Sequence, residues 1–326
     1  MKLIEAVPNI SEASNTENLA CILRELRAIL GQVRLLHVDS NADANRTVLT
    51  LAGSPEQVVQ ACFELFQICQ NRIDMRSHKG AHPRLGAVDV CPLVPIQDIT
   101  LQETAVFANQ LAHHVASELN IPVYLYEANA KTAERKNLAF IRQGEYESLP
   151  QKLHTLPPDY GPQCFSPSVA RTGASVIGAR NFLIAFNISL DTQNVKIAKQ
   201  IAAKLREKNG GLPGVKAIGW YMPAYQCAQV SFNITDFKKS NLNDVFEACK
   251  REASSLGTRI TGSELIGLVP QEAILKAGQF YSTNTHDKQT LINLAVDHLL
   301  LNNIRPFIIR EKILENALTA ESQTFT

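Results

Sequence analysis

One order of predicted elements occurs twice along this 326-residue chain, and it limits the fold more than any other feature. Apolar and β-branched runs predict strands, and apolar side chains at helical spacing behind capping residues predict helices. In the first half, the predicted strands are 2–7, 33–38, 46–52 and 87–94. The predicted helices are 15–30, with Ser14 as the capping residue, and 55–66. The order is therefore β-α-β-β-α-β.

The same order returns in the second half, although residue identities barely repeat. There the predicted strands are 181–189, 215–222, 225–234 and 258–260, and the predicted helices are 193–205 and 242–256. Two such units indicate an α+β protein of two tandem ferredoxin-like subdomains, each a sheet with helices packed on one face. We place the subdomains at residues 1–178 and 179–326.

Other segments extend these two units. Thr100 and Glu103 match a capping box that opens a helix through Leu119, and residues 122–126 predict a short strand in the first sheet. Residues 271–280, 290–299 and 310–318 predict helices on the second unit. The stretch 128–170 has no clear periodicity. Within it, residues 137–142 are expected to be helical, and the Pro- and Gly-rich part, 156–168, is predicted to be an irregular linker or a binding loop.

Charge and composition argue against two classes of partner and indicate a location. A formal net charge of +1 provides no long-range field for a phosphate backbone, so nucleic acid is an unexpected partner. No apolar run approaches the roughly 20 residues that cross a bilayer, so we expect no membrane partner. Seven cysteines without C-x-x-C spacing indicate reduced thiols and a cytoplasmic location.

A loop at residues 73–84 concentrates the polar chemistry. His78, His82, Lys79 and Arg84 lie close together, and Gly80 and Pro83 prevent a regular helix. The two histidines have the spacing of a zinc helix, but the helix is broken and a third ligand is lacking, so we expect no metal. General acid and base chemistry by a histidine is the favoured use of this loop.

Alternatives stay open around this loop. A thiol nucleophile at Cys91 is disfavoured because the residue lies in an apolar strand, where burial keeps a thiol protonated. Asp39 and Asp43, in a second polar loop, either orient the histidine or only bond to their own backbone. Cations that either bind carboxylates or form a solvated surface are Arg46, Lys79, Arg84 and Arg180. Residues 173–179 lack a nucleotide-binding glycine pattern.

Seven segments of the sequence resemble the formiminotransferase domain family. They occur in the family's order, cover nearly the whole chain and leave no stretch for a cyclodeaminase domain. The segments are Glu5–Glu12, Val38–Val48, Ile73–Pro92, Pro122–Tyr126, Gly178–Asn187, Ile218–Tyr221 and Gly262–Pro270.

The resemblance implies a reaction and its residues. The family transfers the formimino group of N-formimino-L-glutamate to the position-five nitrogen of tetrahydrofolate, as a glutamate formimidoyltransferase of histidine degradation. His82 matches the family's catalytic base, Asp39 matches an assisting acid, and Lys79, Arg84 and Arg180 are expected to bind substrate carboxylates. The family also implies a folate cleft between the two subdomains and a homodimer. The expected folate-binding residues are Gly161, Pro162, Gln163, Cys164, Phe165, Ser166, Pro167, Ser168 and Gly173.

The sequence alone does not identify the substrate that donates the one-carbon group. Ala81 stands where members of the family often carry Glu, and Asn41 replaces a glycine of the Asp39 loop. Relatives that use N-formylglutamate or formiminoglycine are therefore alternatives. A third reading, from another class, is a non-catalytic module that binds RNA, although the sequence lacks the aromatic strand typical of such modules.

Overall fold

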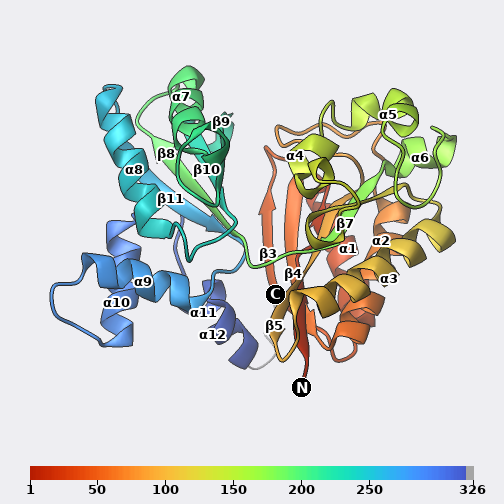
Figure 1. Ribbon diagram of the computed structural model, residues 1–326, viewed down its shortest axis with the longest axis horizontal. Coiled ribbons are helices and arrows are strands. Elements are labelled where there is room, and N and C mark those ends of the chain that lie inside the picture. Colours follow the sequence, from red (N-terminus) through yellow and green to blue (C-terminus); the bar gives the residue numbers. More distant parts are fainter. Residues whose placement is uncertain (321–326) are drawn as a thin grey trace. The chain divides into compact units, whose positions relative to one another are not determined.

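The computed structural model describes residues 1–320 of the chain. It divides into two compact units, one comprising Met1–Asn181 and the other beginning at Phe182 (Figure 1). Each unit combines one β-sheet with helices, which confirms the prediction of two tandem α+β domains.

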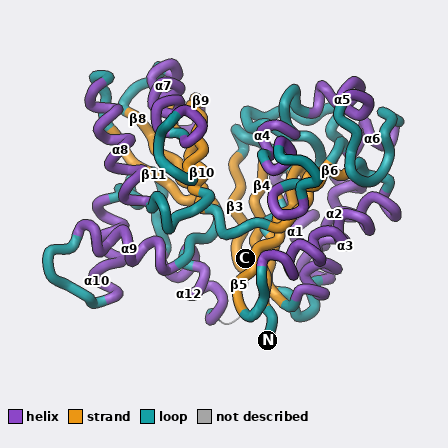
Figure 2. The backbone as a smooth tube through the Cα atoms, viewed as in Figure 1, coloured by secondary structure: helices purple, strands orange, loops and turns teal. Residues whose placement is uncertain are grey.

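The first unit contains a seven-stranded sheet (Figure 2). Its central strand is broken at Pro8 into β1 and β2, which both pair with β4 on one side and β5 on the other. The full order is β3, β4, β1/β2, β5, β7 and β6, and only the pairs β5–β7 and β7–β6 are parallel. The strands are β1 Leu3–Ala6, β2 Asn9–Ile10, β3 Arg34–Asn41, β4 Arg46–Gly53, β5 Val88–Gln97, β6 Val123–Leu125 and β7 Ser175–Ala179.

Three long helices build the main core of this unit. They are α1 Thr16–Ile29, α2 Pro55–Arg72 and α3 Leu101–Leu119. Alternate residues of the strands, such as Ile4, Leu49 and Leu51, are fully buried and belong to one cluster with helix residues such as Ile22 and Leu65. Strand alternation and the apolar stripe of each helix thus meet in one core.

Short elements form a second, smaller core in the same unit. They are η1 Glu127–Asn129, η2 Glu134–Lys136, α4 Leu138–Ile141, η3 Tyr146–Ser148, α5 Leu149–Thr155 and α6 Pro167–Thr172. Ile141 and Leu149 pack with Tyr124, Val176 and Leu85 in a cluster separate from the main core. This small core holds the segment that joins α4 to α5 next to the loop before β5.

The second unit contains a four-stranded antiparallel sheet in the order β11, β8, β10 and β9. Its strands are β8 Ile184–Leu190, β9 Val215–Met222, β10 Cys227–Ile234 and β11 Ile260–Ile266. Helices α7 Val195–Leu205 and α8 Leu242–Ser255 complete the order β-α-β-β-α-β. The remaining elements are η4 Glu207–Asn209, η5 Pro223–Tyr225, α9 Gln271–Tyr281, α10 Lys288–His298, α11 Ile309–Lys312 and α12 Leu314–Thr319.

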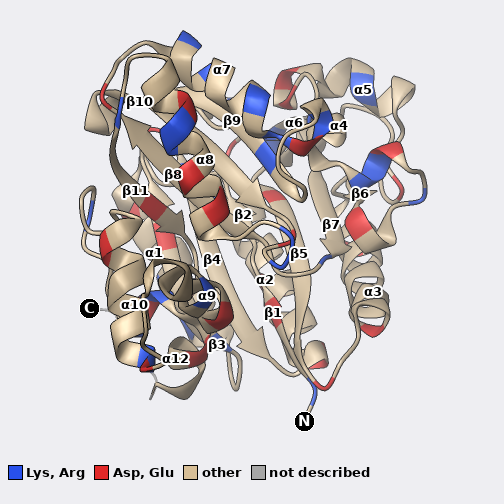
Figure 3. Cartoon of the chain, turned by 60° about the vertical axis from the view of Figure 1, so that its left-hand side comes forward, with Lys and Arg blue, Asp and Glu red and all other residues tan. Residues whose placement is uncertain are grey.

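Side chains on the two faces of this sheet differ. Phe186 and Phe232 face each other in register and are buried in the core beneath the helices. Gln229, one residue away from Val230 in β10, lies on the opposite face and accepts a hydrogen bond from Trp220 Nε1 at 2.9 Å. Basic and acidic positions are interspersed along the chain (Figure 3). Within residues 1–320, no helix is both long and apolar enough to span a bilayer.

Candidate active site

The polar loop between α2 and β5 is irregular, as the sequence predicts, and contacts between main chains fix it. Met75 N donates to the carbonyl of Arg171 at 2.8 Å, and Ala81 N donates to the carbonyl of Asp43 at 3.0 Å. A Cβ atom at Gly80 would lie only 2.3 Å from the carbonyl oxygen of Ala44, so this position needs glycine. The loop therefore packs directly on the turn at residues 42–45.

Asn45 links the two polar loops. Its backbone has a φ of 45°, a conformation that asparagine tolerates better than most residues. Its Oδ1 accepts hydrogen bonds from Ala13 N and Ser14 N, both at 2.9 Å, and its Nδ2 donates to the carbonyl of Lys79 at 2.8 Å. One side chain thus joins three segments that are distant in sequence.

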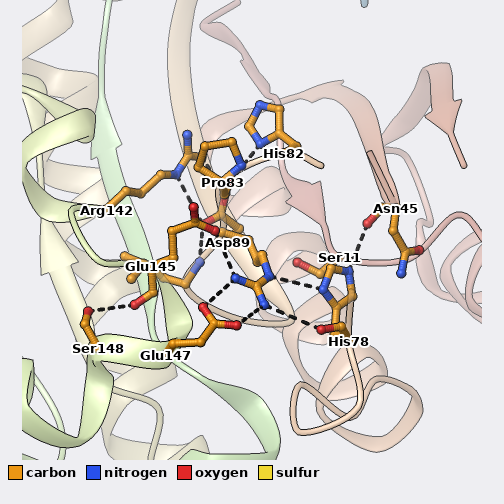
Figure 4. A network of polar contacts seen from close by, with 12 residues as sticks. Ser11, Asn45, His78, His82, Pro83, Asp89, Arg142, Glu145, Glu147 and Ser148 are labelled. Atoms are coloured by element: carbon orange, nitrogen blue, oxygen red, sulfur yellow. Dashed lines mark hydrogen bonds and ion pairs between the residues drawn. The ribbon is translucent and has the colours of Figure 1, made fainter. Parts of the chain in front are cut away.

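His78 uses both ring nitrogens in contacts with the protein. Its Nε2 lies 3.1 Å from the carbonyl oxygen of Asn45, and its Nδ1 lies 3.3 Å from Arg84 Nε (Figure 4). A carbonyl only accepts and a guanidinium only donates, so the proton of the neutral ring is on Nε2. Burial, opposed by the Asn45 contact and aided by the charge of Arg84, lowers the pKa of His78. His78 is thus a neutral bridge between two loops.

Arg84 is surrounded by hydrogen-bond partners. Its Nη1 donates to Glu145 at 2.9 Å and to Glu147 at 2.8 Å, and its Nη2 donates to the other oxygen of Glu147 at 2.5 Å (Figure 4). The bond to Glu147 is the largest of the effects that raise the pKa of Arg84. Its side chain is 7% exposed, whereas those of Glu145 and Glu147 are 40% and 58% exposed.

Asp89 is the buried centre of a second ionic cluster. Its carboxylate accepts from Arg46 Nη1 at 2.6 Å, from Arg142 and from Leu85 N at 2.8 Å. Burial alone would raise the pKa of Asp89, but the charges of Arg142 and Arg46 outweigh it and lower the pKa to about 2. The cluster of one carboxylate and two guanidinium groups carries a net positive charge.

His82 lies next to this cluster. Its Nδ1 is 2.8 Å from the carbonyl oxygen of Pro83, so the neutral ring carries its proton on Nδ1 and its lone pair on Nε2 (Figure 4). Burial, followed by the charges of Arg46 and Arg142, brings the pKa of His82 well below its usual value of 6.5. At neutral pH the ring is therefore in the form that accepts a proton.

A cavity of about 410 Å³ adjoins the same loop. This volume is within the range of small-molecule sites, roughly 300–1,000 Å³. Because Arg84 is buried behind them, the carboxylates of Glu145 and Glu147 supply most of the accessible charge beside it, and exposed Lys79 supplies a cation. The lining residues are Lys79, Gly80, Arg84, Gly144, Glu145 and Glu147.

The expected folate-binding residues lie at the amino-terminal ends of β6 and β7. Gln163 and Cys164 are exposed, and the ring of Phe165 is 6.3 Å from that of Tyr146 in an edge-on contact. Ser166 caps α6 by accepting from Val169 N at 3.3 Å. The predicted irregular loop therefore ends in a short helix at Pro167 that the sequence did not indicate.

Gly173 brings the end of this segment against the histidine loop. It has a φ of 69° and pairs with Gly86, and a Cβ atom here would lie 2.2 Å from the carbonyl oxygen of Leu85. The structure thus places Gly173 beside the residues that follow His82 and Arg84. The histidine loop, Gly86 and Gly173 all lie at the amino-terminal ends of the parallel strands β5 and β7.

Asp39 and Arg180 belong to other elements of the unit. Asp39 is part of β3, paired with Val48 of β4, and its carboxylate is 3.6 Å from Nε2 of His37. Arg180 follows the carboxyl-terminal end of β7, at the other end of that strand from Gly173. Its Nη1 donates to the carbonyl of Asn181 at 3.0 Å.

Two other expectations concern cysteine and metal. Cys91 is fully buried, and its hydrogen bond with Cys62 together with burial raises the pKa of its thiol well above the usual value. This thiol is unsuited to nucleophilic attack at neutral pH. Among the described residues 1–320, no three His, Cys, Asp or Glu side chains are grouped so that they could hold a metal ion.

Sequence reasoning missed several charged residues of the site. Asp89 gave a detectable signal, because it is the one charge in an apolar strand. Arg142, Glu145 and Glu147 gave none, since they lie in or beside short elements without periodicity. Their partners on the histidine loop become visible only in three dimensions.

Comparisons with known proteins cover both units. Residues 3–180 match the family described as the N-terminal subdomain of the formiminotransferase domain, and residues 185–319 match the formiminotransferase domain. The chain is 42% identical to a glutamate formimidoyltransferase of Streptococcus pyogenes serotype M1, over 86% of this chain and 93% of that protein. A glutamate formimidoyltransferase of Thermoplasma acidophilum is 38% identical, with 86% and 92% covered.

A longer relative is also similar. The formimidoyltransferase-cyclodeaminase of Mus musculus is 43% identical over 96% of this chain. The chain spans 59% of the length of that protein.

Proposed function

This chain belongs to the formiminotransferase family, and from that premise we propose that it is a glutamate formimidoyltransferase. It transfers the formimino group of N-formimino-L-glutamate to the position-five nitrogen of tetrahydrofolate and releases glutamate. Two relatives of this name are matched over more than nine tenths of their length, which supports the activity. The observation that carries the mechanism is the contact of His82 Nδ1 with the carbonyl of Pro83 at 2.8 Å, which directs the proton of the neutral ring to Nδ1.

The reaction needs a group that accepts and returns one proton. The acceptor nitrogen attacks the amidine carbon, a new carbon–nitrogen bond forms, and the attacking nitrogen loses its proton. The bond to the glutamate nitrogen then breaks, and that nitrogen gains a proton. We assign both transfers to Nε2 of His82, because the Nδ1 proton is directed at the Pro83 carbonyl.

The contacts of the ring nitrogens support His82 rather than His78 as the base. His78 has both nitrogens bound to Asn45 and Arg84, so proton transfer there would break a contact between loops. Arg46 and Arg142 lower the pKa of His82, so the ring is neutral at neutral pH, although the same charges make it a weaker proton acceptor. The same charges make the imidazolium a stronger acid once it forms, which helps it return the proton.

The proposal also includes three assignments that follow from the resemblance to the family. Asp39 assists the base, the residues from Gly161 to Ser168 together with Gly173 contact folate, and Lys79, Arg84 and Arg180 bind substrate carboxylates. The position of Gly173 beside Leu85 supports the second assignment. A substrate carboxylate at Arg84 has to compete with Glu145 and Glu147, whereas Lys79 is exposed at the cavity.

Charge in the cavity favours an amidine donor over a formyl donor. An amidine is protonated at neutral pH, and its planar N–H groups match a carboxylate as a guanidinium does. Glu145 and Glu147 both bind Arg84 but are still 40% and 58% exposed, and they line the cavity together with Lys79. A neutral N-formyl group has no positive charge to pair with these carboxylates.

A further part of the proposal concerns the topology of each unit. We propose that each unit has a ferredoxin-like core, because in both sheets the strands of the β-α-β-β-α-β unit lie in the order four, one, three, two. The homodimer, the cytoplasmic location and the role in histidine degradation stay predictions that follow from the family.

One assay tests the proposal. Purified protein is mixed with tetrahydrofolate and either N-formimino-L-glutamate, N-formylglutamate or formiminoglycine, and glutamate or glycine release is measured. We expect the highest kcat/KM with N-formimino-L-glutamate. Turnover of N-formylglutamate alone would make the protein a formyltransferase, and salt-sensitive RNA binding without turnover would favour the binding module.

A further inference from the structure

A buried lysine close to the site has no role in the chemistry described so far. Lys152 of α5 is 7% exposed, and its Nζ donates to the carbonyl of Ile141 at 2.6 Å and also to the carbonyl of Gln143. A buried ammonium group is costly unless it is hydrogen-bonded. Its partners here are backbone carbonyls, so the position of Lys152 is coupled to the path of the main chain.

These carbonyls belong to a segment that has little stability of its own. Helix α4 spans only Leu138–Ile141, about one turn, and such a helix is marginal without tertiary contacts. The chain then turns through Gly144 with a φ of 79° and Glu145 with a φ of 55°. Carbonyls at a helix end need donors, and Lys152 supplies them.

The same segment provides the site with three charged side chains. Arg142 binds Asp89, while Glu145 and Glu147 bind Arg84. A main-chain bond of 2.9 Å from Tyr146 N to the carbonyl of Arg84 adds to these contacts. Whatever sets the path of residues 141–147 therefore sets the charges around the histidine loop.

We propose that Lys152 is a positioning residue of the active site. Its ammonium group holds the carbonyls of Ile141 and Gln143, and this keeps the guanidinium of Arg142 against Asp89 and near His82. Lys152 touches no reacting atom, and its effect on the His82 ring is exerted through Arg142. The kinetic part of this inference rests on the proposed function, and the structural part does not.

The consequence is measurable at His82. The charged groups that act on this ring are Arg46 on β4, Arg142 after α4 and Asp89 on β5, together with the carbonyl of Pro83. If Arg142 moves away, one positive charge is lost and protonation of the ring becomes easier. Burial lowers the pKa of Lys152 to about 8, so its ammonium form is present at neutral pH, where the measurement is made.

The test compares two buried lysines. Lys152→Met removes the ammonium group but keeps an unbranched apolar side chain. The matched control is Lys312→Met in the second unit, because Lys312 Nζ also donates to two carbonyls, those of Leu265 at 3.1 Å and Gly267 at 3.4 Å. The titration of His82 is followed by NMR of its ring Cε1–H in both variants of the full chain.

We expect the pKa of His82 to rise toward 6.5 in Lys152→Met and to stay unchanged in Lys312→Met. With tetrahydrofolate and N-formimino-L-glutamate, kcat of Lys152→Met should fall about tenfold to a hundredfold, because the catalytic geometry loosens. A folded Lys152→Met protein with the native His82 titration would overturn the inference. If the wild-type protein lacks transferase activity but the titration shifts as expected, the proposed function fails and this inference stands.

Two further variants cover the case in which Lys152→Met does not fold. Lys152→Gln keeps a neutral donor for one carbonyl and should give a smaller rise in the His82 pKa. Arg142→Met should give the full rise directly, and adding Lys152→Gln to it should cause no further rise. Additive rises in the double variant would show that Lys152 does not act through Arg142.

Discussion

At the scale of single residues, the two histidines of the loop differ in what their ring nitrogens bind. His78 connects Asn45 and Arg84, whereas His82 directs Nδ1 at the neighbouring carbonyl of Pro83. Their four-residue spacing suggests equivalence, but their ring nitrogens have different partners. These partners become visible only in the structure.

His82→Ala should abolish most of the transfer and leave the fold intact. Loss of a general acid–base group lowers rates by about 10²–10⁴-fold. Glutamate release measures the activity, while circular dichroism and folate binding serve as controls. A variant within a few-fold of the wild-type rate would exclude His82 as the base.

His78→Ala is the matched comparison. Removal of this ring breaks the contacts to both Asn45 and Arg84, so this variant should lose stability. Its unfolding midpoint in urea should fall, in contrast to that of His82→Ala.

Glu145→Gln should change donor preference. Glu147 keeps both of its bonds to Arg84 in this variant, so the arginine stays in place while one negative charge at the cavity is removed. We expect kcat/KM for the amidine donor to fall about fivefold, equivalent to about 1 kcal/mol for a partly exposed charge pair. The kcat/KM for N-formylglutamate, measured in parallel, should not change. An equal fall for both donors would argue against an amidinium contact.

Asp89→Asn should destabilise the first unit strongly. Removing one partner from a buried ionic cluster leaves uncompensated charges, at a cost of about 3–5 kcal/mol. Because the folded pKa of Asp89 is about 2, lower than the unfolded value, its contribution is present above about pH 4 and is lost as pH falls toward 2. Urea unfolding at neutral pH and near pH 3 measures both effects.

The exposed Asp98→Asn serves as the control for this measurement. Asp98 binds the chain's amino terminus at 3.1 Å on the surface, so its loss should have a small effect. Equal destabilisation by the two variants would contradict the role given to the buried cluster.

At the scale of elements, local sequence signals predicted the long helices well. The capping box at Thr100 is confirmed by both of its bonds, from Glu103 N at 3.2 Å and from Thr100 N to Glu103 at 2.8 Å. The helix expected behind Ser14 begins at Thr16 with Asn15 as its cap. Among the short elements, α4 lies within the helix expected at residues 137–142, but α5 was not predicted, because so short a span shows no period and depends on tertiary contacts.

Gly173→Ala tests how the elements are joined at the site. The substitution adds a Cβ atom 2.2 Å from the carbonyl oxygen of Leu85 at a φ of 69°. Gly31→Ala is the matched control, since Gly31 has a φ of 55° but no atom within 4 Å of an added Cβ. We expect Gly31→Ala to cost about 1 kcal/mol and Gly173→Ala clearly more, with loss of folate binding. Similar unfolding midpoints for the two variants would show that the contact at Gly173 is not tight.

At the scale of the whole molecule, the order of elements predicted more than residue identities did. Hydrophobic periodicity identified two β-α-β-β-α-β sets, although their sequences barely repeat, because each set only has to bury one face of a sheet. The order in which strands pair depends on contacts between residues that are distant in sequence, such as those between β1 and β5. The charges around His82 depend on such contacts too, which explains why a sequence reading found the histidine but not Arg142.

Separate cores lead to a final prediction, that residues 1–181 fold without the second unit. The main and small cores of this unit consist of its own side chains, and Arg46, Arg142 and Asp89, which set the titration of His82, all belong to it. A fragment of residues 1–181 should therefore unfold cooperatively in urea and keep a His82 pKa well below 6.5. It should show no transferase activity if the second unit contributes to substrate binding. If the fragment is folded but NMR gives a His82 pKa near the ordinary value of 6.5, the arginine charges do not control the pKa of this ring.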